Sequence, residues 1–225
     1  MSPASHTASR LRRLYRVLLS RVHLLNQKLS SAGSPHRSEN PLSMAGPDCG
    51  VEQLEPRLLL STWTVTDTSD YASGGSLANL TGSLRYCILN AGAGDTIKFS
   101  SSLNGKTIGL TSGWLEISKP LTIQGPGAGI LTIDGTNNEK LGYWTAGIFE
   151  VDNAATVVIS GLTIANAFAP RYDGAGIYLT HGANLTVSGC IFSKNQGGYG
   201  GGIAYNGSYG GSLSVANSVF TECDG

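Results

Sequence analysis

The chain has 225 residues, of which 31 are glycine and 40% are hydrophobic, while only 13% are charged. A formal net charge of zero argues against nucleic acid as the main partner. No run of about 18 consecutive apolar residues occurs, so no transmembrane helix is predicted, and the glycines lack the three-residue period of collagen.

Charge and glycine content divide the chain near residue 61. Residues 1–60 hold eight Lys or Arg and four Asp or Glu, whereas residues 61–225 hold seven and eleven. Only three of the 31 glycines precede residue 61. We therefore predict a basic leader and linker over residues 1–50 and a glycine-rich domain over residues 62–225.

Residues 10–29 predict a short basic amphipathic helix. Its apolar residues recur at spacings of three and four and form one stripe: Leu11, Leu14, Leu18, Val22, Leu25 and Leu29. The uncharged stretch Val17–Ser20, between Arg16 and Arg21, is too short for the apolar region of a secretory signal. Two interpretations stay open: a targeting or membrane-surface segment, and an unstructured leader or a start placed too early, with Met44 as the true start. A polar linker follows over residues 30–50.

Residues 51–61 contain a short motif directly after this leader. The stretch Leu54–Leu60 reads LEPRLLL and closely resembles the LEPR-xLL motif found near the N-terminus of many large exported proteins of planctomycete bacteria. The resemblance implies export and residence outside the cell, at the cell surface or in association with the outer membrane.

Residues 62–94 predict the start of a folded domain. Residues 62–67 alternate as a strand, and residues 82–94 predict a short helix with Ser83 as its N-cap and Gly92 as its stop. Leu84, Ile88 and Leu89 are expected on one face of that helix, where they would cover the exposed end of a repeat domain.

From residue 95 onward, short β-type runs alternate with Gly, Asn, Asp and Ser. The runs cover residues 95–99, 115–117, 121–125, 131–135, 148–151, 156–161, 162–166, 176–179, 185–189, 190–195, 202–205, 213–217 and 218–220. None is long enough for a helix. Glycines between them suit sharp corners, because glycine tolerates a positive φ and close backbone approach.

These runs repeat in register. Steps of 28 residues relate Ile159, Val187 and Val215, then Ile164, Phe192 and Phe220, then Leu162, Cys190 and Ser218. We expect steps of 26 residues from Ile133 to Ile159 and from Gly176-Ile177 to Gly202-Ile203. Three short strands per period predict a coil of a parallel β-helix. The sequence lacks the consensus of a leucine-rich repeat, and its period is too short for a propeller blade.

The residues also resemble known families. Residues 82–85, 95–99 and 121–128 look like the start of a bacterial right-handed β-helix domain, and the later runs continue that pattern. Phe192–Asn195 and Gly201–Ile203 resemble the F-x-x-N and GG-x-I repeats of polymorphic outer-membrane proteins, although Phe220 is followed by Cys223 rather than asparagine. The predicted fold class is thus all-β, a right-handed parallel β-helix with a short N-terminal capping helix, of the kind often described as pectate-lyase-like.

Candidates for catalysis and metal binding are few. A β-helix lyase needs a base and usually converging carboxylates for Ca²⁺, and a hydrolase needs clustered carboxylates. Arg171 and Asp173, in the longest interruption at residues 167–174, and Lys194 are the catalytic candidates; a turn ion pair and a surface lysine are the plainer interpretations. Glu150 and Asp152 share one strand face and are the metal candidates, with solvated surface as the plainer interpretation. No cofactor is identified, apart from Ca²⁺ if the chain is a lyase.

Cysteines and tyrosines give weaker indications. No C-x-x-C pair occurs, so no zinc ribbon is predicted; Cys190 is expected in the core, and a Cys190–Cys223 disulfide is a candidate. His181 is expected in a solvent-facing turn. Five tyrosines are candidates for stacking on sugar rings, with ordinary turn aromatics as the alternative: Tyr172, Tyr178, Tyr199, Tyr205 and Tyr209.

Three functional hypotheses remain. The first is an exported structural or adhesive surface module that binds glycans or other surfaces. The second is a polysaccharide lyase or hydrolase of the pectate-lyase type, acting on acidic glycans. The third is an autotransporter-like passenger. Because the sequence stops at Gly225 inside a repeat, we also expect a fragment or miscalled gene whose open last coil pairs with missing coils or with another chain.

Overall fold

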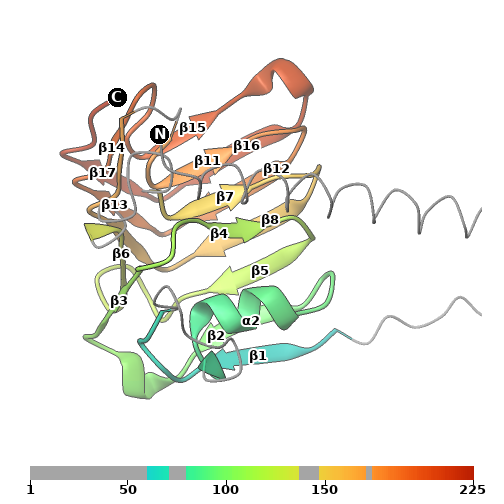
Figure 1. The fold of residues 1–225 in the computed structure, drawn as a ribbon, viewed down its shortest axis with the longest axis vertical. Helices are drawn as coiled ribbons and strands as arrows, with labels where there is room; N and C mark the ends of the chain where they lie inside the picture. Colours follow the sequence, from blue (N-terminus) through green and yellow to red (C-terminus); the bar gives the residue numbers. More distant parts are fainter. Residues whose placement is uncertain (1–59, 71–79, 137–146, 171–173) are drawn as a thin grey trace, which may run out of the picture. The chain divides into compact units, whose positions relative to one another are not determined.

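The computed structural model describes residues 60–70, 80–136, 147–170 and 174–225 (Figure 1). The chain divides into two compact units, Met1–Glu55 and Pro56–Gly225, and every described residue belongs to the second. The predicted amphipathic helix, the linker and most of the LEPR-like motif lie outside the described residues.

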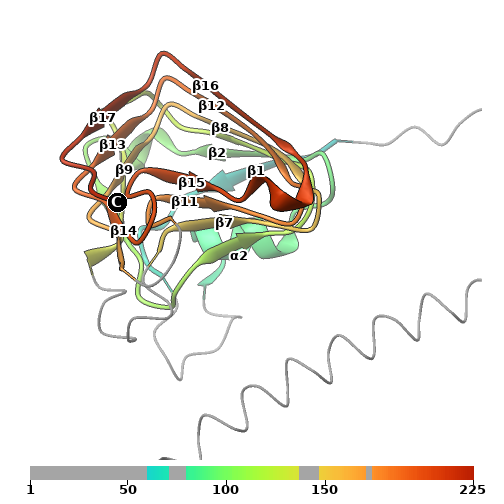
Figure 2. The same ribbon diagram turned by 90° about the horizontal axis from the view of Figure 1, so that it is seen from above.

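Short parallel strands build a solenoid (Figures 1 and 2). Sheet A contains β1 (Thr62–Val65), β2 (Thr96–Phe99), β5 (Leu121–Gln124), β8 (Thr156–Ser160), β12 (Asn184–Ser188) and β16 (Ser212–Ala216). Sheet B contains β3 (Thr107–Gly109), β6 (Thr132–Asp134), β9 (Thr163–Ala165), β13 (Ile191–Ser193) and β17 (Val219–Thr221). Sheet C contains β4 (Leu115–Ile117), β7 (Phe149–Val151), β11 (Ile177–Leu179) and β15 (Ile203–Tyr205). The chain passes from A to B to C in each turn, and about four turns are complete.

A fourth ladder interrupts the path from sheet B to sheet C. In the third and fourth turns, β10 (Phe168–Ala169) pairs with β14 (Gln196–Gly197). Part of the interruption expected at residues 167–174 is therefore a strand. Two short 3-10 helices complete the described elements, η2 (Ser101–Leu103) and η4 (Gly207–Tyr209).

Strand register confirms most of the predicted repeat. Val187 pairs with Ile159 on one side and with Val215 on the other, and Phe192 pairs with Ile164 and Phe220 in the same way. The expected step from Ile133 to Ile159 is wrong, because Ile133 lies in sheet B and pairs with Ile164. The LTI-x-G sequence occurs twice in one turn, at residues 121–125 in sheet A and at residues 131–135 in sheet B. Segments with similar sequences can therefore occupy different sheets of the solenoid.

Inward-facing aliphatic ladders form the core. The sheet A ladder contains Ile97, Ile123, Ile159 and Val187, and the sheet B ladder contains Ile108, Ile133, Ile164 and Phe192; all are at most 1% exposed. Cys190 is also buried, as predicted. Burying each such side chain contributes roughly 1.5–3 kcal/mol, so stacked coils supply most of the stabilisation.

The predicted capping helix forms as α2 (Leu84–Asn90). Ser83 caps it by accepting a hydrogen bond from the Tyr86 amide at 3.2 Å. The helix packs against β1 and β4, beside the edge of sheet C where an earlier turn would place a strand. It therefore covers one end of the core.

The predicted apolar face of α2 is corrected in one position. Leu84, Cys87 and Ile88 are buried, but Leu89 is 53% exposed. At 100° per residue, Leu89 lies about 140° around the helix from Leu84, whereas Cys87 and Ile88 lie within about 60° of it. The helix ends at Asn90 with Ala91 as its C-cap, one residue before the predicted stop at Gly92.

Asp95 ties the strand β1 to the end of this helix. Its carboxylate accepts hydrogen bonds from the Ser61 amide at 2.7 Å, the Trp63 indole Nε1 at 2.9 Å and the Gly92 amide at 2.7 Å. The bonds from Ser61, Trp63 and Gly92 lower the pKa of Asp95 below its usual value, because each of them favours the charged carboxylate.

The last described turn has a more exposed interior. Val215 and Phe220, which continue the inward-facing ladders, are 41% and 45% exposed, although Phe220 still stacks on Phe192 with ring centroids 4.6 Å apart. The candidate Cys190–Cys223 disulfide is absent, and both residues are free thiols. Cys223 lies one turn after Asn195, whose amide nitrogen approaches its sulfur at 3.9 Å, rather than one turn after Cys190.

Within the described ranges, no helix is long and apolar enough to cross a bilayer.

Candidate functional site

The outer face of sheet C carries the most distinctive row of side chains. Strand register places Glu116 beside Glu150, and Glu150 beside Tyr178. Their neighbours along each strand point inward and are buried, so this row faces outward. The row continues to Ala204, which is 7% exposed because the backbones of Gly174 and Gly200 pass close to its methyl group.

Trp114 extends this row across three turns. It directly precedes β4 in the first turn, yet its ring centroid lies 6.4 Å from that of Tyr178 in the third turn, with the ring planes at 49°. The indole passes over Gly147, which leads into β7, and a Cβ on that glycine would overlap the ring. Glycine at residue 147 thus lets the indole reach Tyr178. We call Trp114 and Tyr178 the aromatic platform.

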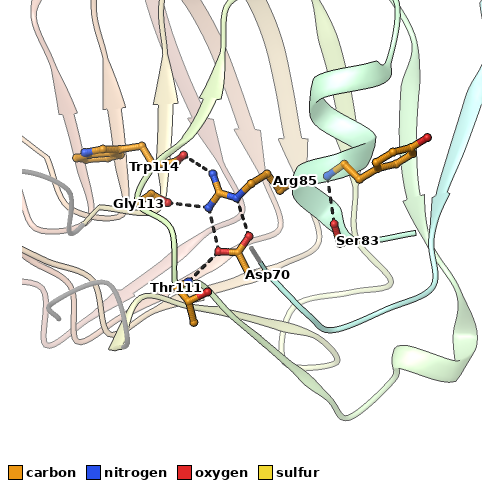
Figure 3. A network of polar contacts seen from close by, with 7 residues as sticks. Asp70, Ser83, Arg85, Thr111, Gly113 and Trp114 are labelled. Carbon is orange, nitrogen blue, oxygen red and sulfur yellow. Dashed lines mark hydrogen bonds and ion pairs between the residues drawn. The ribbon is translucent and has the colours of Figure 1, made fainter. Parts of the chain in front are cut away.

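A buried ion pair lies behind the turn that holds Trp114 (Figure 3). Arg85 of α2 donates to both carboxylate oxygens of Asp70, at 2.6 and 3.0 Å, and their side chains are only 12% and 1% exposed. The same guanidinium donates to the carbonyl oxygens of Gly113 at 2.9 Å and Trp114 at 2.8 Å. Asp70 also accepts from the Thr111 amide at 2.8 Å. Charged and backbone groups therefore fix this turn from one side.

One polar atom in the same turn lacks a partner. Among the described residues, the Ser112 hydroxyl is the one buried side-chain oxygen or nitrogen without a hydrogen bond. A buried hydroxyl that lacks a hydrogen bond costs about 1–3 kcal/mol relative to a paired one.

A second cluster lies at the corner between sheets C and A. His181 Nδ1 lies 2.7 Å from the Asp152 carboxylate, and the His181 ring centroid is 5.0 Å from that of Tyr209. His181 is 53% exposed at the side chain, as expected of a turn residue, and its φ of 47° is in the left-handed region. The three residues come from successive turns of the solenoid.

Among the described residues, Glu150, Asp152 and Lys194 do not converge into one centre. Glu150 lies in β7 and Asp152 directly follows it, where Asp152 bonds to the Asn153 amide and pairs with His181. Lys194 is exposed after β13 in sheet B, and its φ is 55°. Arg171 and Asp173 lie outside the described residues. No group of three or more His, Cys, Asp or Glu suited to a metal ion occurs in the part of the chain that the structure describes.

The tyrosines predicted to stack on sugars separate in the same way. Tyr178 belongs to the platform, Tyr209 contacts His181, and Tyr205 donates to the Gly210 and Gly211 carbonyls at 3.2 and 2.9 Å. Tyr199 is 85% exposed in a turn, and Tyr172 lies outside the described residues.

Trp114, Glu116 and Arg85 were not among the site residues predicted from the sequence. The first two lie in the first turn, where Glu116 pairs with Glu150 at a longer step than the 28 residues of the later turns. The pattern of β4, with Glu116 between buried Leu115 and Ile117, was the available signal.

Comparison with known protein families supports the β-helix fold. A family model described as a right-handed beta helix region matches residues 126–225. The chain is therefore similar to that family over its later turns, and the parallel solenoid is an all-β right-handed β-helix. Neither a curated protein nor a solved structure matches the chain.

Proposed function

We propose that this β-helix is the glycan-binding module of an exported protein, at the cell surface or outside the cell, and that the aromatic platform is its sugar-binding site. The observation that carries the proposal is the Trp114–Tyr178 pair on the outer face of sheet C. Export is supported by the resemblance of Leu54–Leu60 to the LEPR-xLL motif.

The platform combines the two features that a sugar site needs. Aromatic faces provide rigid apolar area for the C–H groups of a sugar ring, and neighbouring polar groups orient its hydroxyls. Glu150 lies beside Tyr178 in the strand register, and Glu116 lies one strand further. Their carboxylate oxygens are hydrogen-bond acceptors for sugar hydroxyls.

The test is affinity electrophoresis of the full chain through gels containing neutral, amino or acidic polysaccharides, followed by calorimetry with the retarding polymer. Trp114→Ala and Tyr178→Ala are expected to weaken binding about five- to tenfold each, because one aromatic contact contributes roughly 1–1.5 kcal/mol beyond the area it buries.

Tyr209→Ala is the control, since Tyr209 is an exposed aromatic residue that lies at the corner with His181, away from the half-buried platform residues. It should retain the wild-type affinity. Retardation that survives both platform substitutions, or that depends on Tyr209 instead, would place the site elsewhere. No retardation by any polymer would remove the proposal.

Cleavage of a polysaccharide is the second candidate function, favoured by the adjacent carboxylates of Glu116 and Glu150. Most glycoside hydrolases use two such carboxylates on either side of the scissile bond. Release of reducing ends that is abolished by Glu116→Gln and by Glu150→Gln would support a hydrolase. Unsaturated products lost in Arg171→Ala or Lys194→Ala would instead indicate a lyase, whose Ca²⁺ dependence could then be measured.

A further inference from the structure

We propose that Arg85, on the capping helix, is a positioning residue for the aromatic platform. It fixes the backbone from which the Trp114 indole reaches across β7. This inference rests on the proposed function for its biological meaning, but its structural part can be tested separately.

The geometry is specific to Trp114. Arg85 donates to the carbonyl of Gly113 and to the carbonyl of Trp114 (Figure 3), so it binds the two peptide units on either side of the Trp114 Cα. Fixing both peptide units fixes φ and ψ of Trp114, and with them the direction of its Cα–Cβ bond. A planar guanidinium can hold both carbonyls at once, whereas a lysine ammonium presents a single charged point.

The guanidinium is itself held in place. Two bonds to the Asp70 carboxylate orient it, and that carboxylate is 1% exposed and also accepts from the Thr111 amide. On the opposite side, the indole lies over Gly147, and the Leu115 amide donates to the Ile148 carbonyl at 2.7 Å. The Trp114 backbone is therefore held by Arg85 on one side, and its indole lies against Gly147, which precedes β7, on the other.

A purely stabilising role for the Asp70–Arg85 pair is the alternative. The capping region contains a second, partly buried network that allows the two roles to be separated, because Asp95 accepts hydrogen bonds from Ser61, Trp63 and Gly92 but not from residues 111–114. Loss of cap stability alone would make variants of either network behave alike.

The experiment uses the full chain labelled with 5-fluorotryptophan, whose three tryptophans give three fluorine resonances. Trp114→Phe and Trp63→Phe assign two of them. Arg85→Lys should shift and broaden the Trp114 resonance while leaving that of Trp63 in place, and Asp95→Asn should do the reverse. Affinity for the retarding polysaccharide should fall about tenfold in Arg85→Lys and stay within about twofold in Asp95→Asn, with both proteins folded.

Each result has a defined meaning. An unmoved Trp114 resonance in Arg85→Lys, or equal effects of the two substitutions on it, would overturn the positioning role. A shifted resonance with no polysaccharide bound by the wild type would keep the positioning role and remove the proposed function. If Arg85→Lys does not fold, Asp70→Asn keeps the guanidinium but weakens its anchor, and it must then move the same resonance.

Discussion

At the N-terminal end of the solenoid, helix α2 covers the core, and Asp70 and Asp95 are buried among hydrogen-bond donors. The last described turn, by contrast, leaves Val215 and Phe220 partly exposed. Equivalent positions therefore have different surroundings. Phe192 and Phe220 occupy the same ladder and stack in parallel, yet Phe192 is fully buried and Phe220 is 45% exposed.

This difference shows how a solenoid distributes its stability. Inner turns gain contacts from both neighbours by repetition, so each ladder residue is stabilised twice. At the end covered by α2 there is no neighbouring turn on one side. Hydrogen bonds and an ion pair of non-repeating residues stabilise that end instead. Arg85 belongs to this capping region and also donates a hydrogen bond to the Trp114 carbonyl. The capping region and the candidate site are therefore in direct contact.

The largest expected effect compares the two phenylalanines. Phe192→Ala should lower the free energy of unfolding by about 3–5 kcal/mol, because it leaves a cavity in a closed core. Phe220→Ala should lower it by only about 1–2 kcal/mol, since less apolar surface is lost. Urea unfolding followed by circular dichroism measures both. Equal losses would show that the last turn is as tightly packed as the inner ones.

Breaking the ion pair at the covered end comes next. Arg85→Met should lower the free energy of unfolding by about 3 kcal/mol, because it leaves the Asp70 carboxylate buried without its cation. The double substitution Asp70→Leu with Arg85→Met should recover part of that loss, since no unpaired charge remains. A double variant as unstable as the sum of both single variants would contradict this account.

The Asp95 network predicts a pH dependence of a defined sign. Its hydrogen bonds lower the folded-state pKa below the unfolded value of about 4, so the stabilisation is present above pH 4 and is lost as the pH falls through the folded-state pKa. Asp95→Asn should flatten the fall in unfolding free energy between about pH 5 and pH 2. A slope equal to that of the wild type would assign the acid sensitivity to other carboxylates.

Sequence alone predicted the parts of the fold that repeat. Alternating β-branched residues predicted most of the strands but missed β3, β10 and β14. The 28-residue step placed Val187 and Phe192 in their ladders. The errors lie where repetition fails. Leu89 is apolar like Leu84 and Ile88, but it points in a different direction around the helix and is exposed. Ile133 lies in an LTI-x-G sequence like that of a sheet A strand, but it belongs to sheet B.

The candidate site was less predictable for the same reason. Glu150 was predicted, with Asp152, as a metal-binding candidate, but its neighbours in space, Glu116 and Tyr178, come from turns of unequal length. The contact between Arg85 and Trp114 joins a helix to a turn at no repeating interval, so no periodic pattern indicates it.

The smallest expected effect concerns two serines near the capped end. Ser112→Ala removes a buried hydroxyl without a partner and should leave the free energy of unfolding unchanged or raise it by up to about 1 kcal/mol. Ser83→Ala removes the oxygen that accepts from the Tyr86 amide and should lower it by about 1 kcal/mol. The same chemical change is thus expected to have opposite signs at two positions, and calorimetric melting temperatures measure both. A clear loss in Ser112→Ala would mean that its hydroxyl has a partner in solution, and that the turn behind Trp114 is as fully hydrogen-bonded as the rest of the cap.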